Sequence, residues 1–378
     1  MDKKVAESSN LRWDPYIFFK NDQCNTFFKK HFLKNGNNRK ILFILGLGFD
    51  PRMNFGIKEL NNEVDPLEIE VILLKFRQEK NKHSKKYKAL TDSNLAEIRS
   101  LKNVNITEIQ LQDIGKKREI EAAKFFTKQL ISDYTDIFLD ISSLPRSIYF
   151  STTGKILSLI DNLQCDSIIN FFIATTENAE IDSMITEVGI NNDLEYQHGF
   201  GGQIEVVSKS IPKIWFPLTG EGKTNQFRSA NQFIEPAEIC PLLPFPSKDL
   251  RRSDNIYIEN HDLFFNELQI ESQNIMYVPE QNPFEAYKKI IKAADNYNKT
   301  LSELGGCKAI ISSFSSKLLS IGAILAAYEY KNKKKKLSIG ILNVNSMDYK
   351  IEYENELKYT VKKSELFVNW LTGIPYQN

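Results

Sequence analysis

Hydroxyl-bearing and cationic side chains follow two short apolar segments of this chain, and both sets suit the binding of an anion. After Ile137–Leu139 the sequence reads Asp140-Ile141-Ser142-Ser143-Leu144-Pro145-Arg146. After Ala309–Ile311 it reads Ser312-Ser313-Phe314-Ser315-Ser316-Lys317. Each pattern predicts a strand, a hydroxyl-rich loop and then a helix whose first N–H groups attract negative charge. The alternative is a purely structural role, in which the serines cap the helix and Arg146 is solvated.

Two glycine turns follow other apolar segments and form a second pair of candidate ligand loops. The first follows Ile41–Leu45 and reads Gly46-Leu47-Gly48, with Asp50 and Arg52 just beyond. The second follows Ile214–Phe216 and reads Thr219-Gly220-Glu221-Gly222, with Arg228 beyond. Glycine allows a phosphate or ribose to come close to backbone N–H groups. Because the first turn is neither a P-loop nor a complete dinucleotide fingerprint, an ordinary strand-to-helix turn is the alternative.

Alternating apolar and amphipathic segments predict the elements that would position these loops. Runs rich in Ile, Val, Leu and Phe predict strands at 41–46, 69–76, 105–111, 137–141 and 168–174, with helices at 91–101, 116–132 and 145–161. The second half repeats the plan, with strands at 213–218, 274–278, 308–312 and 337–344 and helices at 226–238, 284–304 and 315–331. Such alternation is typical of an α/β fold with a mostly parallel sheet covered by helices on both faces.

The spacing of the two halves predicts an internal duplication. The serine pairs lie 312 − 142 = 170 residues apart, and the strands before the glycine turns lie 214 − 41 = 173 apart. We therefore expect two tandem Rossmann-like lobes, 39–210 and 211–378, after an N-terminal helical arm, 1–38. The arm either packs on the first lobe or docks a partner. The glycine-rich stretch 197–202 is expected to join the lobes as a mobile loop, 236–254 to be irregular, and the apolar C-terminal tail to pack on the second lobe.

The loops that follow the first and fourth strands of an open α/β sheet lie along one edge. Arg52 and Arg146 are therefore expected to be the cationic groups of the first lobe, and Arg228 and Lys317 those of the second. Packing of two such lobes about a pseudo-twofold axis predicts either two ligand sites or one shared site.

Three residues are candidates for catalysis. His198 lies in the glycine-rich stretch, although a flexible connector is the alternative there. Asp50 and Asp140 could hold a metal together or act as acid and base if their loops face one cleft. Asp140 could equally orient Arg146 or cap a helix. The histidines show no metal-ligand spacing, so we predict no metal site.

The composition excludes several classes of function. With a net charge of +1, no global field calls for nucleic acid or an acidic membrane, and the basic stretches 80–88 and 333–336 are expected to be solvated loops. The scattered Cys24, Cys165, Cys240 and Cys307 indicate reduced thiols. No signal peptide and no run of about 20 apolar residues is present, so we expect a cytoplasmic protein.

The four loops resemble those of Rossmann-like sensor domains of bacterial antiphage defence systems, of the CARF and SAVED kind. The resemblance covers roughly residues 40–345 and rests on the glycine turns together with Ser142, Ser143, Arg146, Ser312, Ser313 and Lys317. It implies paired domains that bind a cyclic or linear oligonucleotide through the loops after the first and fourth strands. The usual glycine-rich fourth-strand motif ending in Thr-Lys is absent, and no nuclease, protease or membrane effector is attached. The resemblance thus implies either a sensor that reports to a separate effector protein or an enzyme that acts on the bound nucleotide.

Three functions remain open from the sequence. The first is a cytosolic protein that binds a nucleotide-like anion and shifts one lobe against the other or alters a partner. The second is an enzyme that cleaves a phosphodiester or N-glycosidic bond with Asp50 or Asp140. The third is an interaction subunit without a ligand, for which closed and apolar loop ends are expected. The sequence is compatible with a monomer or an oligomer.

Overall fold

The fold is taken from a computed structural model. It describes residues 11–34, 39–65, 67–76, 87–112, 115–163, 168–190, 194–201, 204, 210–332, 337–354 and 356–377. The basic stretch 333–336 and most of 80–88 lie outside the described residues.

The first sheet has seven strands, in the order β1-β16-β6-β5-β2-β3-β4. Five of them run parallel: β2 (Ile41–Leu47), β3 (Ile69–Phe76), β4 (Val104–Leu111), β5 (Asp136–Asp140) and β6 (Asn170–Glu177). The other two, β16 (Glu365–Thr372) and β1 (Ile17–Lys20), are antiparallel additions beside β6. Every residue of β5 is buried, as expected for a strand covered on both faces.

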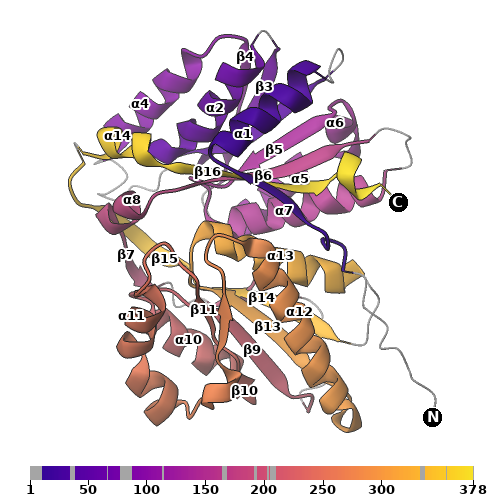
Figure 1. Cartoon of the computed structure of the whole chain (residues 1–378), viewed down its shortest axis with the longest axis vertical. Helices are drawn as coiled ribbons and strands as arrows, with labels where there is room; N and C mark the ends of the chain where they lie inside the picture. The colour runs from indigo at the N-terminus through magenta and orange to yellow at the C-terminus, as the bar shows by residue number, and fades with distance from the viewer. Residues whose placement is uncertain are drawn as a thin grey trace.

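The second sheet repeats this order of parallel strands. It runs β12 (Met276–Val278), β11 (Leu242–Pro244), β9 (Lys213–Leu218), β13 (Lys308–Ser313), β14 (Ser338–Asn343). In both sheets the parallel strands therefore stand in the order third, second, first, fourth, fifth. The short β10 (Glu238–Ile239) also pairs with β9. Two Rossmann-like lobes, each a mostly parallel sheet flanked by helices, are thus confirmed, whereas their origin by duplication stays a prediction (Figure 1).

Helices fill the connections between the strands of each lobe. In the first lobe they are α2 (Phe55–Val64), α4 (Lys88–Arg99), α5 (Gly115–Phe125), α6 (Lys128–Ser132) and α7 (Arg146–Asp161). In the second they are α10 (Thr224–Ile234), α11 (Arg252–Glu259), α12 (Pro283–Thr300) and α13 (Lys317–Asn332). Helices α7 and α13 have 16 residues each and contact each other. One apolar core cluster includes buried side chains of both helices, so the lobes share a core.

The lobes exchange their last strands. Strand β16 lies in the first sheet although it belongs to the segment 211–378, and β8 (Glu195–Tyr196), from the segment 39–210, pairs antiparallel with β14 in the second sheet. The predicted lobe boundaries therefore do not hold for these strands. The apolar C-terminal run does not pack as a tail on the second lobe, because its buried residues complete the first sheet.

Between the lobes lies a two-stranded antiparallel ribbon, formed by β7 (Ile185–Ile190) and β15 (Ser346–Ile351). Each of its strands leads from the fifth parallel strand of one lobe towards the strand that is exchanged into the other lobe. Figure 1 shows this β7–β15 ribbon at one side of the junction between the lobes. Short helices α8 (Ala179–Met184) and α14 (Leu357–Thr360) flank it along the chain.

Several local predictions differ from the structure. The N-terminal segment, expected to be helical, contains in its described part β1, then α1 (Asp22–Phe28) and a π-helical turn (Lys29–Lys34). The stretch 236–254, expected to be irregular, contains β11, the second parallel strand of its lobe. The helix expected over 116–132 is divided into α5 and α6, because Thr127 caps a new helix by accepting a hydrogen bond from Leu130 N.

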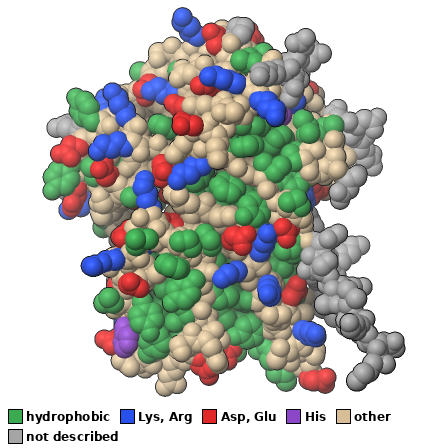
Figure 2. Space-filling view, viewed as in Figure 1, with side chains coloured by type: hydrophobic (Ala, Val, Ile, Leu, Met, Phe, Trp, Pro, Cys, Tyr) green, Lys and Arg blue, Asp and Glu red, His purple; other side chains and the backbone are tan. Residues whose placement is uncertain are grey.

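Charged side chains of both signs are interspersed on the face of the molecule seen in Figure 2, in keeping with the net charge of +1. In the part of the chain that the structure describes, no helix has the length and apolar character needed to cross a membrane.

Candidate functional site

The carboxyl ends of the two parallel sheets meet at the junction of the lobes. Arg146 Nη2 donates a hydrogen bond to the Ser315 carbonyl (2.5 Å), and Lys317 Nζ donates one to the Ser142 carbonyl (2.6 Å). The cation of each fourth-strand loop thus reaches the loop of the opposite lobe. We call this junction the seam and define it by Asp50, Arg52, Ser142, Arg146, Glu177, Asp182, Glu187, Lys223, Ser315 and Lys317.

Helix geometry explains why the two cations lie together. Arg146 and Lys317 are the first residues of α7 and α13. Pro145 precedes α7 in an extended conformation, and Ser316 Oγ accepts a hydrogen bond from Leu319 N (3.1 Å) at the start of α13. A third link joins the same helices, between Tyr149 OH and Ser320 Oγ (2.5 Å). Two helix N-termini, each of which attracts negative charge, and two cations are thus brought to the seam.

In each lobe the glycine turn packs directly on the fourth-strand loop. Ser143 Oγ donates to the Gly46 carbonyl (2.7 Å), and a Cβ at Gly46 would lie 2.6 Å from Leu144 Cδ2. A Cβ at Gly220 would lie 2.3 Å from the Phe314 carbonyl oxygen. Because the two loops pack closely, a side chain at position 46 or 220 would clash, which explains why both positions are glycine. The expected meeting of first-strand and fourth-strand loops is observed.

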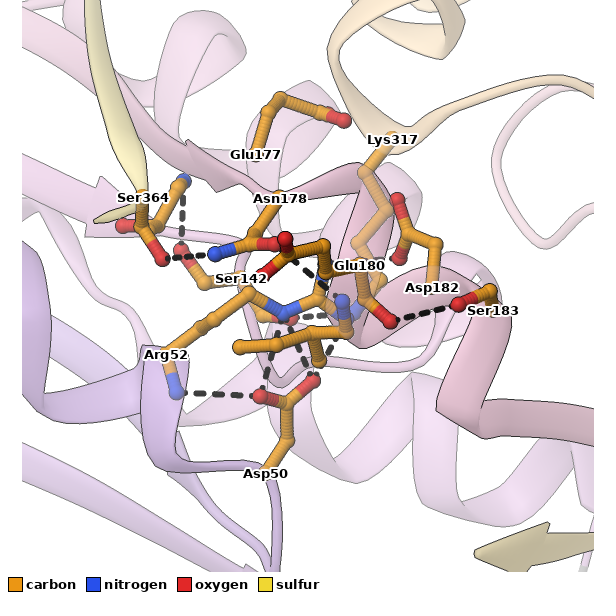
Figure 3. Close-up of polar contacts among 12 residues, drawn as sticks. Asp50, Arg52, Ser142, Glu177, Asn178, Glu180, Asp182, Ser183, Lys317 and Ser364 are labelled. Carbon is orange, nitrogen blue, oxygen red and sulfur yellow. Dashed lines mark hydrogen bonds and ion pairs between the residues drawn. The ribbon is translucent and has the colours of Figure 1, made fainter. Parts of the chain in front are cut away.

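Arg52 links two acidic residues at the seam, as Figure 3 shows. Its guanidinium donates to both carboxylate oxygens of Asp50 (2.7–3.1 Å) and to Asp182 Oδ1 (2.7 Å). Burial alone would raise the pKa of Asp50, but the charge and hydrogen bonds of Arg52 lower it. Asp50 also accepts from Arg52 N (3.0 Å), which caps the turn after β2. Asp50 is therefore an ionised structural partner of Arg52.

Among the four cations of the seam, Lys317 is the one whose charge is not balanced by an ion pair within the described residues. Burial lowers its pKa to about 8, partly offset by the charge of Asp50 and reinforced by Arg52 and Arg146. Its ammonium forms no ion pair with a carboxylate of the described residues. Glu177 lies near Lys317 (Figure 3). Its Oε1 accepts a hydrogen bond from Leu318 N (3.0 Å), so a carboxyl group of the first lobe caps α13. Burial raises the pKa of Glu177 to about 7.

Glu187, on the β7–β15 ribbon, lies between cations of both lobes. Its Oε2 is 2.5 Å from Lys223 Nζ and accepts a hydrogen bond from Ser346 Oγ (2.5 Å). Its Oε1 lies 3.7 Å from Arg146 Nη1. Burial alone would raise the pKa of Glu187, but Arg146 and Lys223 lower it to about 2.

Asp140 is buried at the end of β5. Its Oδ1 accepts a hydrogen bond from Ser142 N (2.8 Å). Its Oδ2 has no partner among the described residues and lies 2.7 Å from where a Cβ at Gly56 of α2 would be. Burial raises the pKa of Asp140 to about 7. Asp50 and Asp140 thus do not form an exposed acid–base pair, and the described residues contain no cluster suited to a metal ion.

The remaining predicted site residues lie apart from the seam or face inwards. Arg228 is paired with Glu267 (2.6 and 3.0 Å) on the surface, and Gly222 N donates to Glu259 (2.9 and 3.1 Å). Thr219 Oγ1 donates to the Leu242 carbonyl (2.8 Å), and Ser312 Oγ accepts from Trp215 Nε1 (3.0 Å). Ser313 Oγ is buried without a partner in the described part of the chain, and a Cβ at Gly48 would lie 3.8 Å from Ser143 Cβ, an ordinary contact.

His198 does not lie among the loops of the seam. It occupies the turn after β8, where its carbonyl accepts a hydrogen bond from Ser151 Oγ (3.3 Å) of α7. Its neighbour Gln197 is buried and donates to Glu119, Ser147 and Ser151 (2.8–2.9 Å). The glycine-rich stretch is therefore anchored on α7 in its described part rather than free.

Sequence reasoning missed four acidic or basic residues of the seam: Glu177, Asp182, Glu187 and Lys223. Glu177 is the last residue of the fifth parallel strand. The strand pattern therefore could have predicted a carboxyl group at the carboxyl end of the first sheet. Lys223 directly follows Gly222. Glu187 lies between the strands expected at 168–174 and 213–218, where the sequence predicts no element, and no sequence pattern pointed to it.

Comparison with known proteins assigns no family. No protein-family model matches the sequence, and no curated protein does. The structure has a remote likeness to a universal stress protein from Pseudomonas aeruginosa UCBPP-PA14 (TM-score 0.22, 11% identity, 86% of this chain and 97% of that one). A universal stress protein from Archaeoglobus fulgidus DSM 4304 gives a TM-score of 0.24 at 11% identity, over 81% of this chain and 97% of that one. The cytoplasmic domain of a prokaryotic cation chloride cotransporter gives 0.21 at 9% identity, over 82% and 95%. Such low TM-scores support no conclusion about function.

Proposed function

We propose that this protein binds a phosphate-bearing, nucleotide-like ligand at the seam and that binding moves one lobe relative to the other. The observation that carries the proposal is the reciprocal placement of Arg146 and Lys317. Each begins the helix after the fourth parallel strand of its own lobe and donates to a backbone carbonyl of the other lobe.

The electrostatics of Lys317 favour an added anion. A carbonyl oxygen accepts a hydrogen bond but carries no net charge to balance a buried cation. The lowered pKa of Lys317, about 8, is caused chiefly by burial and reflects this poor compensation. A phosphate placed between the helix N-termini would gain from both cations and from the helix dipoles.

A ligand at this position would act on the arrangement of the lobes. Phosphate contacts would replace the hydrogen bonds from Arg146 to Ser315 and from Lys317 to Ser142, which now join the lobes. A ligand shifts an equilibrium only by its differential affinity for the two states, and a site made of both lobes provides such a difference. This supports a sensor. The separate effector protein and the antiphage setting implied by the resemblance are part of the proposal.

Binding is favoured over turnover and over a subunit without a ligand. Asp50 is engaged by Arg52, and the free oxygen of Asp140 faces Gly56, so neither offers an acid or base to a ligand between the lobes. The loop ends are closed against each other, as expected for a subunit without a ligand. They are charged rather than apolar, however, which the third hypothesis did not predict.

The test is a thermal-shift screen with mononucleotides, linear dinucleotides, and cyclic di- and oligonucleotides. At a concentration one hundred times Kd, a ligand of the folded state stabilises it by about 2.7 kcal/mol. We expect at least one nucleotide to stabilise the wild type but not Arg146→Gln or Lys317→Met. Arg228→Gln is the matched control, since its surface pairing with Glu267 predicts an unchanged shift. Full stabilisation of both seam variants by the same nucleotide would refute the site.

A further inference from the structure

The β7–β15 ribbon covers one side of the seam and is attached to both lobes. On the first lobe, Tyr349 of β15 contacts Phe49, which follows the glycine turn, at a ring distance of 6.3 Å. Ile351 N donates to Tyr87 OH (2.9 Å) before α4. On the second lobe, Glu187 of β7 pairs with Lys223, which precedes α10. The ribbon is therefore placed where a ligand of the seam would meet it.

The groups around Glu187 form a set of donors from three directions. Lys223 comes from the second lobe, Arg146 from the first, and Ser346 from the ribbon itself. The Glu187 carboxylate accepts hydrogen bonds from Lys223 and Ser346 at 2.5 Å each. Its distance to Arg146 Nη1 is 3.7 Å, which is too long for a hydrogen bond. Arg146 Nε is buried and has no partner within the described residues. A carboxylate thus satisfies this set only in part.

We propose that Arg146, Lys223 and Ser346 form an anion subsite for a phosphate or phosphodiester group of the ligand, and that Glu187 occupies it in the absence of ligand. The inference rests on the proposed function and adds a second contact point, on the ribbon side of the seam. A phosphate group presents several oxygens in tetrahedral directions and can reach a guanidinium, an ammonium and a hydroxyl together. Glu187 is then a built-in competitor, and its displacement frees the ribbon from Lys223.

Calorimetric titration with inorganic pyrophosphate tests the subsite without knowledge of the natural ligand. Glu187→Gln removes the competing charge and keeps the shape of the side chain. We expect this variant to bind pyrophosphate about tenfold more tightly than the wild type, which corresponds to about 1.4 kcal/mol. Lys223→Met should bind it at least about tenfold more weakly, since a charged hydrogen bond is lost.

The matched control is Glu180→Gln. Glu180 lies on α8 near the ribbon and pairs with Lys363 (3.2 Å) in a solvent-exposed ion pair, so the same change of charge should leave pyrophosphate affinity unaltered. Glu187→Asp, which withdraws the carboxylate by one methylene, is the second variant if Glu187→Gln does not fold. It should also bind more tightly than the wild type.

The outcomes separate the subsite from the proposed function. Equal or weaker binding of pyrophosphate by Glu187→Gln overturns the subsite, as does an unchanged affinity of Lys223→Met. Absence of pyrophosphate binding in both the wild type and Glu187→Gln overturns it as well. In each case the proposed function stands if Arg146→Gln and Lys317→Met still abolish stabilisation by a nucleotide.

Discussion

Asp140 shows how burial sets the charge of a single residue at the edge of the first sheet. Within the described residues one of its carboxyl oxygens accepts a hydrogen bond, and the other has no partner and faces α2 at Gly56. With 1% exposure, water cannot solvate the charged form, and the pKa rises to about 7 despite the donor Ser142 N. The hydroxyl-rich sequence after β5 predicted a role for this loop. It did not indicate that Asp140 turns inwards, because that depends on a glycine 84 residues away in the chain (140 − 56).

The raised pKa of Asp140 predicts a loss of stability as the pH rises. From about pH 4 to pH 7 the unfolded chain releases this proton while the folded protein keeps it, so the unfolding free energy falls over that range and then levels off. Glu177 and Glu119, both with a pKa of about 7, act in the same direction. Asp140→Asn should reduce the fall measured by denaturant titration from pH 5 to pH 8. The exposed Asp133→Asn serves as control, and an identical profile for wild type and Asp140→Asn would contradict this assignment.

A side chain added at Gly56 is expected to clash with Asp140. Alanine is the better helix former by about 1 kcal/mol, but its Cβ would lie 2.7 Å from Asp140 Oδ2. We expect Gly56→Ala to lower the unfolding free energy by roughly 1–3 kcal/mol through overpacking. Gly48→Ala, whose Cβ would meet nothing closer than 3.8 Å, is the control for denaturant titration. In an Asp140→Ala background the cost of Gly56→Ala should shrink, and a stabilising effect of Gly56→Ala alone would refute the clash.

At the scale of elements, helices α7 and α13 place their N-termini against each other and bring one cation each to the seam. The sequence predicted these helices and their cations well, because hydroxyl-rich loops after buried strands leave a clear local signal. Arg228 was assigned to the same set by its spacing alone. It lies on the outer face of α10, where Glu267 pairs with it, and spacing could not reveal that orientation.

Strands with a weaker local signal were missed. Strand β11 has only three residues, follows Pro241 and itself ends in Pro244, and the run that forms β16 was expected to be a packed tail. Their strand character depends on pairing with distant partners, Leu218 for β11 and the residues 171–177 of β6 for β16. Long-range pairing of this kind overrides local propensity.

Lys317 predicts a trade-off between stability and binding. Because burial lowers its pKa, the folded state holds the charged form at a cost below about pH 8. Replacement of such a buried charge by an apolar side chain is often stabilising, so Lys317→Met should raise the unfolding free energy by roughly 1–2 kcal/mol at pH 7. Denaturant titration measures this, with the exposed Arg228→Met expected within about 0.5 kcal/mol of the wild type. A markedly less stable Lys317→Met would indicate a structural rather than a ligand-binding lysine.

At the scale of the whole molecule, the exchange of β8 and β16 ties the lobes together. Neither segment of the chain, 1–210 or 211–378, contains all the strands of one sheet. The offset of 170–173 residues predicted two lobes of equal plan, which the strand orders match. It could not predict the exchange, because the spacing of the repeats is the same whether the last strand pairs within its own lobe or with the sheet of the other lobe.

The exchange predicts that the halves do not fold alone. Expressed separately, 1–210 and 211–378 should each lack a cooperative thermal transition in circular dichroism, whereas the two expressed together should copurify and melt as one unit. Attachment of residues 365–377 to the first fragment through a flexible linker should restore its transition, because β16 then completes the first sheet. Independent cooperative melting of both unmodified fragments would contradict a shared fold.

The measurement that tests the central claim most directly is a crystal structure with the nucleotide that stabilises the protein most. We predict a phosphate group within hydrogen-bond distance of both Arg146 and Lys317, with their contacts to Ser315 and Ser142 replaced and the lobes rearranged. A nucleotide bound elsewhere, with both contacts across the seam intact, would contradict the account.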